Sequence, residues 1–400
     1  MTDKKRVLSG MRPTGALHLG HYHGALKNWT RLQSEMDCYY FVADWHALTT
    51  HYENPDVIEA SVYEMVIDWL ATGIDPEQCT IFLQSRLPEH AELFTLLAMG
   101  TPISWLERVP TYKDQQLQLK DKDLSTYGFL GYPLLQAADI LIYKAHYVPV
   151  GEDQASHVEL TREAARRFND LYGRRKNDDA KIEAILASLP KDDARYIKSM
   201  AKKRTEQGDA TVLEKLPGFL AKFEGMSLDE KALLTSFVSG KGKVVLIEPD
   251  VLLTNASKLP GLDGRKMSKS YGNAIGIRED AMSITKKIRE MPTDPARVKL
   301  SDKGDPAKCP VWQFHLIYSD ENRKKWVTEG CTTAGIGCIE CKKTISDAIL
   351  AEQQPMLDRA RPFVSNPARV REIVDTGCKK AQITAQQTMV DVRKAMGLNY

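Results

Sequence analysis

The chain has 400 residues, of which 42% are hydrophobic and 27% charged, and its formal net charge is +2. This length predicts two or three domains, and the composition is typical of a globular protein. No apolar run approaches the ~20 residues that span a bilayer, and the charged start Met1–Lys5 differs from a signal peptide, so we expect a cytoplasmic protein.

The first part of the chain alternates predicted strands with predicted helices. Apolar runs predict strands at Lys5–Ser9, Cys38–Ala43 and Cys79–Leu83. Glycines predict a turn over Gly10–Gly15, and helical spacing predicts helices from His18 to about Gln33 and over Val57–Thr72. This alternation predicts an α/β, doubly wound parallel sheet of the Rossmann-like kind, with ligands at the carboxyl ends of its strands.

The later elements are mostly helical. Leu134–Lys144 has helical spacing, and Val244–Ile247 predicts one further strand. Predicted helices follow from this spacing at Ile182–Leu189, Ala194–Lys203, Asp229–Phe237, Ala281–Met291, Val311–Tyr318, Lys342–Ala351, Pro367–Thr376 and Ala381–Met396. We therefore expect a catalytic domain in two parts (1–174 and 244–275), a helical insertion (175–243) and an all-α domain (276–400).

The tetrapeptide His18-Leu19-Gly20-His21 stands where the first predicted helix begins. A helix start presents free N–H groups and the positive end of the helix dipole, which suit a polyphosphate. Gly20 lacks a Cβ, so an adenine ring could approach the backbone, and both histidines can donate ring N–H bonds to a phosphate. Taken alone, so short a pattern is seldom functional.

A second motif, Lys266-Met267-Ser268-Lys269-Ser270, lies in a glycine-punctuated, cationic loop over residues 261–273. Lys266 and Lys269 could clamp the β- and γ-phosphates of a nucleotide, while the two serines bond the oxygens between them. The alternative is a solvated basic loop, which most lysine-rich stretches are. Together, the two motifs predict an enzyme that opens ATP at its α-phosphorus.

With these motifs the chain resembles class I aminoacyl-tRNA synthetases, and further segments resemble the bacterial tryptophanyl-tRNA synthetases. Those segments are Ser9–Gly15, Asp44–Thr49, Gly131–Leu141, Val148–Gln154 and His157–Arg162. The resemblance implies that tryptophan and ATP form tryptophanyl-adenylate and pyrophosphate, and that the aminoacyl group then passes to the 3′ end of tRNA(Trp). It also implies a homodimer. The rivals are the related tyrosine enzyme and an RNA-binding or redox-sensing paralogue that charges no tRNA.

The amino-acid pocket can also be argued from the residues. Leu135, Asp139 and Ile142 share one face of a predicted helix, so the carboxylate would lie among apolar residues and need a specific partner. An indole N–H, which only donates, is one such partner; a nearby helix N-terminus or an arginine is the alternative. The resemblance implies the indole, with Tyr132 and Gln154 holding the amino end of the substrate.

The resemblance also implies the other ligand residues. His18, His21, Lys266 and Lys269 would stabilise the leaving pyrophosphate together with Mg²⁺. The nucleotide-binding residues would be Arg12, Thr14, Gly20, His21, Gly151, Asp153, Gln154, Lys266, Met267, Ser268, Lys269 and Ser270. The substrate-binding residues would be Met11, Asp44, His46, Tyr132, Gln136, Asp139, Val148, Val150 and Gln154. Gln136 stands where other members have methionine, and Arg12 where some have glutamine.

Four of the seven cysteines form a pattern, Cys309-x21-Cys331-x6-Cys338-x2-Cys341. A close pair plus two further cysteines predicts a four-thiolate site, for which zinc is the common occupant. A subset of the resembled family carries a four-iron four-sulfur cluster here, in its anticodon-binding domain, so the resemblance favours the cluster over zinc. From Arg297 to Tyr400 there are 17 Lys and Arg against 12 Asp and Glu, a modest excess that fits RNA contact.

Overall fold

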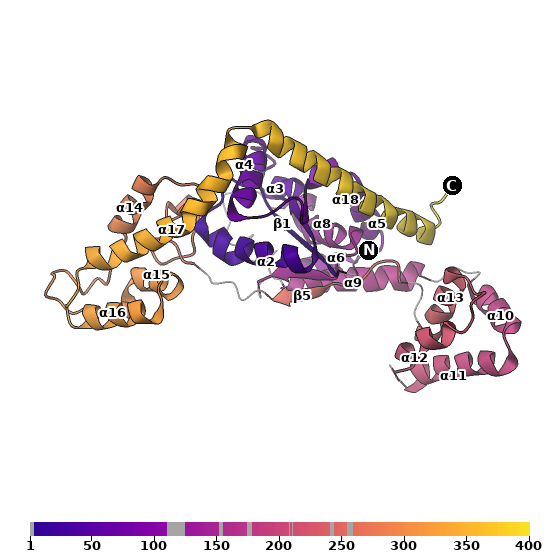
Figure 1. The fold of residues 1–400 in the computed structure, drawn as a ribbon. Helices are drawn as coiled ribbons and strands as arrows, with labels where there is room; N and C mark the ends of the chain where they lie inside the picture. Colours follow the sequence, from indigo (N-terminus) through magenta and orange to yellow (C-terminus); the bar gives the residue numbers. More distant parts are fainter. Residues whose placement is uncertain are drawn as a thin grey trace. The chain divides into compact units, whose positions relative to one another are not determined.

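The computed structural model describes residues 4–109, 125–151, 155–173, 178–207, 209, 211–240, 244–253 and 259–400 (Figure 1). The chain divides into two compact units. The first unit comprises Met1–Arg86 with Leu253–Lys379, and the second comprises Leu87–Leu252 with Lys380–Tyr400.

The first unit contains a parallel sheet of three strands in the order β3-β2-β1. These strands are β1 (Arg6–Met11), β2 (Asp37–Val42) and β3 (Cys79–Leu83). Their registers pair Met11 with Val42 and Val42 with Leu83, so the carboxyl ends of the strands are level. All of β3 and most of β2 is buried, as expected for parallel strands covered on both faces. The predicted parallel sheet is confirmed.

Helices follow each of these strands. They are α1 (Leu19–His21), α2 (Lys27–Glu35), α3 (Asp44–His51), α4 (Asp56–Thr72) and the 3₁₀ turn η2 (Gln84–Arg86). The helix predicted from His18 to Gln33 is correct in extent, but a π-helical turn, η1 (Tyr22–Leu26), interrupts it. Such π turns are rare and often mark functional sites. Here the turn comes directly after the His18–His21 motif.

The remaining helices of the first unit lie within or after the lysine-rich loop. They are η4 (Lys269–Tyr271), α14 (Ala281–Glu290), η5 (Pro306–Lys308), α15 (Pro310–Tyr318), α16 (Glu321–Thr332) and α17 (Cys338–Val364). A buried core joins α14, α15 and α17 to Leu19 and Met267, one apolar residue from each predicted phosphate motif. The packing of this helical part therefore bears directly on both motifs.

The predicted break near Gly377 is wrong, because one continuous helix, α18 (Pro367–Met396), begins in the first unit and ends in the second. Glycine weakens a helix, which favoured a break there. In the structure a Cβ at Gly377 would lie 1.8 Å from the carbonyl oxygen of Ile81 in β3. The glycine thus serves the close packing of this helix on the sheet.

The second unit contains the helices α5 (Glu89–Ala98), α6 (Ile103–Glu107), α8 (Tyr127–Ile142) and α9 (Ala155–Tyr172), with the neighbouring strands β4 (Tyr147–Val150) and β5 (Asp250–Leu253). The strand predicted at Val244–Ile247 is wrong. The buried side chain of Asn169 replaces a strand ladder there: it accepts from the N–H groups of Val245 and Leu246 and donates to the Leu246 carbonyl at 2.8 Å.

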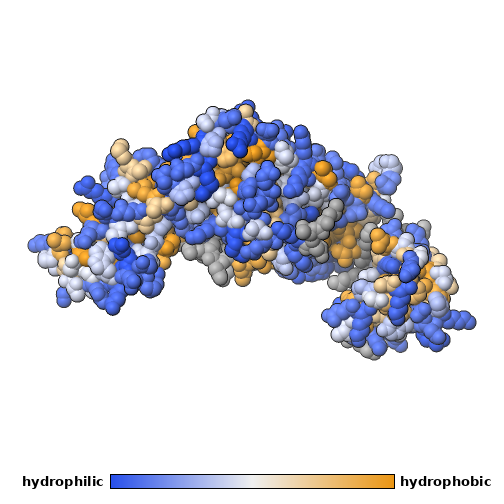
Figure 2. Space-filling model, in the orientation of Figure 1, coloured by the Kyte–Doolittle hydropathy of each residue, from blue (hydrophilic) through white to orange (hydrophobic). Residues whose placement is uncertain are grey.

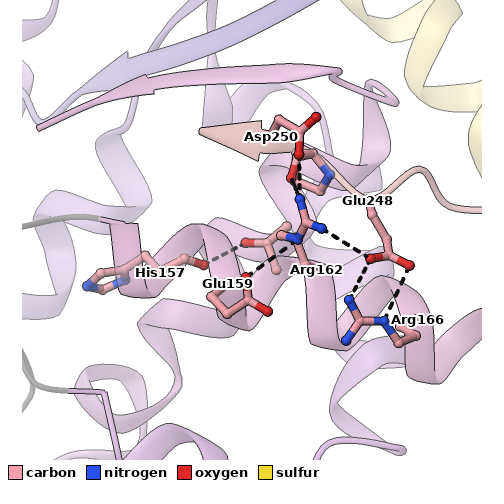
Figure 3. A network of polar contacts seen from close by, with 8 residues as sticks. His157, Glu159, Arg162, Arg166, Glu248 and Asp250 are labelled. Atoms are coloured by element: carbon pink, nitrogen blue, oxygen red, sulfur yellow. Dashed lines mark hydrogen bonds and ion pairs between the residues drawn. The ribbon is translucent and has the colours of Figure 1, made fainter. Parts of the chain in front are cut away.

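A polar network fixes the next part of the same segment to α9 (Figure 3). Arg162 donates to the carbonyl of Pro249 at 3.1 Å and pairs with Asp250 at 2.5 Å, and Arg166 pairs with Glu248 at 2.7 Å. All of these groups are partly exposed, so each pair contributes modestly. Together they hold the chain where it enters β5.

Four helices, labelled in Figure 1, lie between α9 and β5 in the sequence. They have a hydrophobic core of their own. They are α10 (Asp178–Ser188), α11 (Lys191–Gln207), α12 (Thr211–Leu220) and α13 (Leu228–Ser239). The predicted helices at Ile182, Ala194 and Asp229 are confirmed, and α12 was not predicted. On the face shown in Figure 2, most of the coloured residues are hydrophilic. Among the described residues, no helix combines the length and apolarity needed to cross a membrane.

Candidate active site

The first motif is hydrogen-bonded to the chain that leaves the second. The N–H of Leu19 donates to the carbonyl of Ile275 at 2.9 Å, and the N–H of Ile277 donates to that of Leu17 at 3.1 Å. Between these bonds, His18 and Gly276 form an antiparallel bridge. The two segments, about 250 residues apart in sequence, are therefore neighbours in the first unit, as the two-motif hypothesis requires.

His18 and His21 form a stacked pair, with ring centroids 3.8 Å apart. Burial, aided by Lys269 and Lys266, lowers the pKa of His18 to about 4. Burial, then His18 and the same lysines, lowers the pKa of His21 to about 3. Both rings are therefore neutral at pH 7, so each carries a single N–H donor and the positive charge belongs to the lysines. His18 Nδ1 is buried without a hydrogen-bond partner in the described part of the chain, and such a polar atom would be satisfied by a bound ligand.

The second motif lies against the first. Met267 is 4% exposed, and its Sδ accepts from the N–H of Gly20 at 3.3 Å. A Cβ at Gly15 would lie 2.7 Å from the Nζ of Lys269, and Gly15 has a φ of +115°, which only glycine adopts readily. Both lysines of the motif are exposed, but partial desolvation lowers the pKa of Lys269. The Lys269 ammonium therefore lies at the glycine turn between β1 and α1.

Asn273 gives the second motif its shape. Its Oδ1 accepts from the N–H of Ser268 at 2.8 Å, and its Nδ2 donates to the Asp263 carboxylate at 2.7 Å. Asn273 is 3% exposed, and a Cβ at Gly261 would lie 2.2 Å from its Nδ2. The hydrogen bond from Asn273 is the main reason that the pKa of Asp263 is lowered, to about 2. The lysines thus extend from a loop with a specific internal scaffold.

Five predicted ligand residues of the first unit gather near the carboxyl ends of β1 and β2: Met11, Arg12, Thr14, Asp44 and His46. Asp44 opens α3 directly after β2, and its Oδ1 accepts from the N–H of Ser85, just past β3, at 3.0 Å. His46 is 5% exposed in the first turn of α3. Their position agrees with the sequence-based expectation that ligands meet this edge.

Asp139 lies in α8 of the second unit, and it is completely buried. His90 Nδ1 lies 2.7 Å from its Oδ1, and His90 Nε2 lies 2.7 Å from the Tyr143 hydroxyl. Since an ionised carboxylate only accepts, Nδ1–H donates to Asp139, and the Tyr143 hydroxyl donates to Nε2 when the His90 ring is neutral. Pairing within the protein, the alternative considered from sequence, is thus present. A carboxylate has about four acceptor sites, so the bond from His90 does not by itself use all of them.

The other predicted pocket residues of the second unit lie in α8, in β4 or directly after β4. Tyr132 is 2% exposed, and its ring centroid lies 5.6 Å from that of His157. Gln136 and Val150 are half-buried, Val148 is buried and Gly151 is exposed. Asp153, Gln154 and the side chain of Ser270 lie outside the described residues.

The four patterned cysteines are free thiols of intermediate exposure. Cys309 caps α15, Cys331 lies near the end of α16, and Cys338 and Cys341 lie in the first turn of α17. Burial first, and then the thiolates of the other three, raise the pKa of Cys341 to about 12. The four sulfurs therefore share one neighbourhood.

The surroundings of these thiols fit a thiolate-bound group. A Cβ at Gly304 would lie 2.7 Å from the Cys331 Sγ, so glycine keeps that side open. His315 Nε2 lies 3.1 Å from the Cys341 Sγ, and Arg297 donates to that of Cys331 at 3.7 Å. Donors of this kind tune thiolate ligands. Within the described residues, however, no three potential ligand side chains converge tightly enough to hold a metal ion as they stand.

Sequence reasoning missed several residues that shape these sites: His90, Tyr143, Asn273 and His315. Each of them contacts a residue that is distant in sequence or lies in a loop, so no helix or strand periodicity in the sequence indicates the contact. His90 and Asp139 are 49 positions apart, for example. A histidine in a largely apolar helix was a signal for His315, whereas the helix of His90 has two glutamates in its first turn and gave no such signal.

The matching family model is that of the class I tRNA synthetases for tryptophan and tyrosine, over residues 1–189 and 232–351. The chain is 60% identical to the tryptophan–tRNA ligase of Ralstonia nicotianae over 99% of both chains. It is 44% identical to that of Thermotoga maritima over 99% of this chain and 100% of the other.

Solved structures resemble the chain as well. The tryptophanyl-tRNA synthetase of Campylobacter jejuni, crystallised with ADP and tryptophan, has a TM-score of 0.73 at 25% identity. It covers 98% of this chain and 99% of its own. The synthetase of Mycoplasma pneumoniae has a TM-score of 0.65 at 21% identity, over 98% of both chains, and supports the fold.

Proposed function

The chain belongs to the class I tRNA synthetases and is a tryptophan–tRNA ligase that uses ATP; we propose that the residues described above perform its chemistry as follows. The tryptophan carboxylate attacks the α-phosphorus of ATP in line, the bond to the β-phosphate oxygen breaks, and pyrophosphate leaves. A hydroxyl of the terminal tRNA adenosine then takes the aminoacyl group and AMP is released. The first step needs mainly positioning and charge neutralisation from the protein.

His18, His21, Lys266 and Lys269 stabilise the leaving pyrophosphate. The observation that carries this assignment is the meeting of the two motifs. Lys269 lies against the Gly15 turn, and the Nδ1 of His18 is buried with no hydrogen-bond partner among the described residues. Because both rings are neutral near pH 7, they donate hydrogen bonds to phosphate oxygens while the lysines supply the charge. When bound, Mg²⁺ would neutralise further charge on the phosphates. Arg12, Thr14, Gly20, Met267, Ser268, Ser270, Gly151, Asp153 and Gln154 complete the nucleotide contacts.

The experiment is tryptophan-dependent exchange of labelled pyrophosphate into ATP by the wild type and by Lys269→Ala. Removing a charge-assisted contact to the leaving group should lower kcat about 100-fold. Lys325→Ala, at an exposed lysine of α16, is the matched control and should leave exchange unchanged. Equal exchange by the wild type and Lys269→Ala would remove the phosphate-site assignment. Substituting tyrosine for tryptophan should give no exchange.

Asp139 accepts the indole N–H of tryptophan in this proposal. Its complete burial and its orientation by His90 support the assignment, since a fixed acceptor in an apolar site discriminates strongly between substrates. Tyr132 and Gln154 hold the amino end, and Met11, Asp44, His46, Gln136, Val148 and Val150 line the rest of the amino-acid site.

Cys309, Cys331, Cys338 and Cys341 would hold a four-iron four-sulfur cluster, with zinc as the alternative. The four-thiol donor set and the open side at Gly304 support a thiolate-bound group. When bound, the group would supply structural cross-linking of α15, α16 and α17 in the anticodon-binding part of the chain. A homodimer charging tRNA(Trp) completes the proposal, and the mass in solution tests it against the 45.0 kDa of one chain.

A further inference from the structure

Asp68 is a carboxylate in α4 that none of the predicted motifs includes. Its side chain is 2% exposed. Oδ2 accepts from the backbone N–H of Leu17 at 2.9 Å, and Oδ1 accepts from the Nε of Arg278 at 2.6 Å. Burying a carboxylate costs several kcal/mol unless strong partners compensate, so this arrangement is a specific one.

The two partners of Asp68 belong to the two sides of the candidate phosphate site. Leu17 directly precedes His18, and Arg278 lies on the segment that leaves the lysine-rich loop. The same two segments are joined by the Leu19–Ile275 and Ile277–Leu17 backbone bonds. We call these two bonded segments, residues 17–19 and 275–278, the seam. Asp68 accepts a hydrogen bond from each of the two segments through one carboxyl group.

Further hydrogen bonds connect residues 276–278 of the seam to α4 and α17. Arg278 also donates to Glu64, one turn before Asp68, at 2.5 Å. Gln353 of α17 donates to the carbonyls of Gly276 and Ile277 at 2.6 and 3.0 Å. The charge of Asp68 reaches the Lys269 ammonium and partly offsets the lowering of its pKa by burial. Asp68 is therefore coupled to the lysine through charge as well as through the backbone.

We propose that Asp68, paired with Arg278, is a positioning residue that sets the distance between the His18–His21 pair and Lys269 for the activation of tryptophan. This inference rests on the phosphate-site assignment made above. Its physical basis is that catalytic groups must be held closely, and a displacement of about 1 Å can lower a rate about 100-fold. Asp68 touches neither substrate in this account and acts through the seam.

The test compares Asp68→Asn with a matched control, Asp37→Asn. Asp37 also pairs with an arginine, Arg6 at 2.9 Å, but at the opposite end of the sheet strands. Asparagine keeps the shape of Asp68 and an acceptor for Leu17, while it removes the charge that binds Arg278. We expect kcat for pyrophosphate exchange to fall about 10- to 100-fold in Asp68→Asn, with KM for tryptophan within about twofold of the wild type. The control should retain wild-type kcat.

Two further variants separate positioning from simple loss of structure. Arg278→Lys changes the partly exposed partner of Asp68: it keeps the positive charge and loses the planar guanidinium geometry, so it should also lower kcat. This variant provides the test if Asp68→Asn does not fold. In the double variant with Lys269→Ala, Asp68→Asn should add little to the loss from Lys269→Ala alone, because both act on the same group. Independent, multiplicative losses would indicate a purely structural role and overturn the inference.

The outcomes distinguish this inference from the assignment beneath it. If Lys269→Ala is impaired while both Asp68→Asn and Arg278→Lys match Asp37→Asn, the phosphate site stands and the positioning role is wrong. If Lys269→Ala exchanges pyrophosphate like the wild type, both the site and the inference are wrong.

Discussion

At the residue scale, the chemistry of each candidate group follows from its surroundings. Burial keeps His18 and His21 neutral, so they can donate hydrogen bonds without adding repulsion beside two lysines. The residue types of both motifs could be recognised in the sequence as candidates for a phosphate site, because donors at a helix start and cations in a loop suit phosphate groups. Their neutral state was not, since it depends on burial by residues distant in the chain.

The sharpest prediction at this scale concerns Asp139. Asp139→Asn keeps the volume but replaces the ionised acceptor on which His90 and the proposed indole contact depend. We expect kcat/KM for tryptophan in pyrophosphate exchange to fall at least about 100-fold, while binding of ATP measured alone changes little. Asp178→Asn, at a buried acid in α10, serves as the control. Tryptophan kinetics like those of the wild type would refute the indole assignment.

At the element scale, apolar runs and helical spacing located most strands and helices, because those patterns reflect burial directly. These patterns failed at two places: where a side chain satisfied backbone groups instead of a neighbouring strand, and where a glycine in a helix allowed close packing. Asn169 satisfies the backbone at Val245 and Leu246 in place of a strand, and the packing of Gly377 on Ile81 lets a helix continue through glycine. Neither contact leaves a periodic signal, since each joins segments that are far apart in sequence.

The four-cysteine helices α15, α16 and α17 give a prediction at this scale. Protein purified without oxygen should be brown and absorb broadly near about 400 nm, and chelation or air should remove the colour and lower the melting temperature. Cys341→Ser should do the same, while Cys38→Ser, at a buried cysteine outside the pattern, should keep the colour. A colourless protein that carries zinc would instead support the alternative occupant.

At the scale of the whole molecule, the similarity over nearly the full chain agrees with the activity expected from sequence. The two motifs, in this order, were enough to indicate a class I synthetase: the first follows β1 of the parallel sheet, and the second lies in a loop bonded to the first. The supporting contacts of Asp68, Asn273 and His90 could not be predicted, since they are properties of the packed fold.

The most direct test of the account is a crystal structure of the protein with tryptophan and an unreactive ATP analogue. The account predicts phosphate oxygens within about 2.7–3.2 Å of the Lys269 Nζ and of a ring nitrogen of His18. A triphosphate bound away from both groups would contradict the claim that the two motifs form one phosphate site.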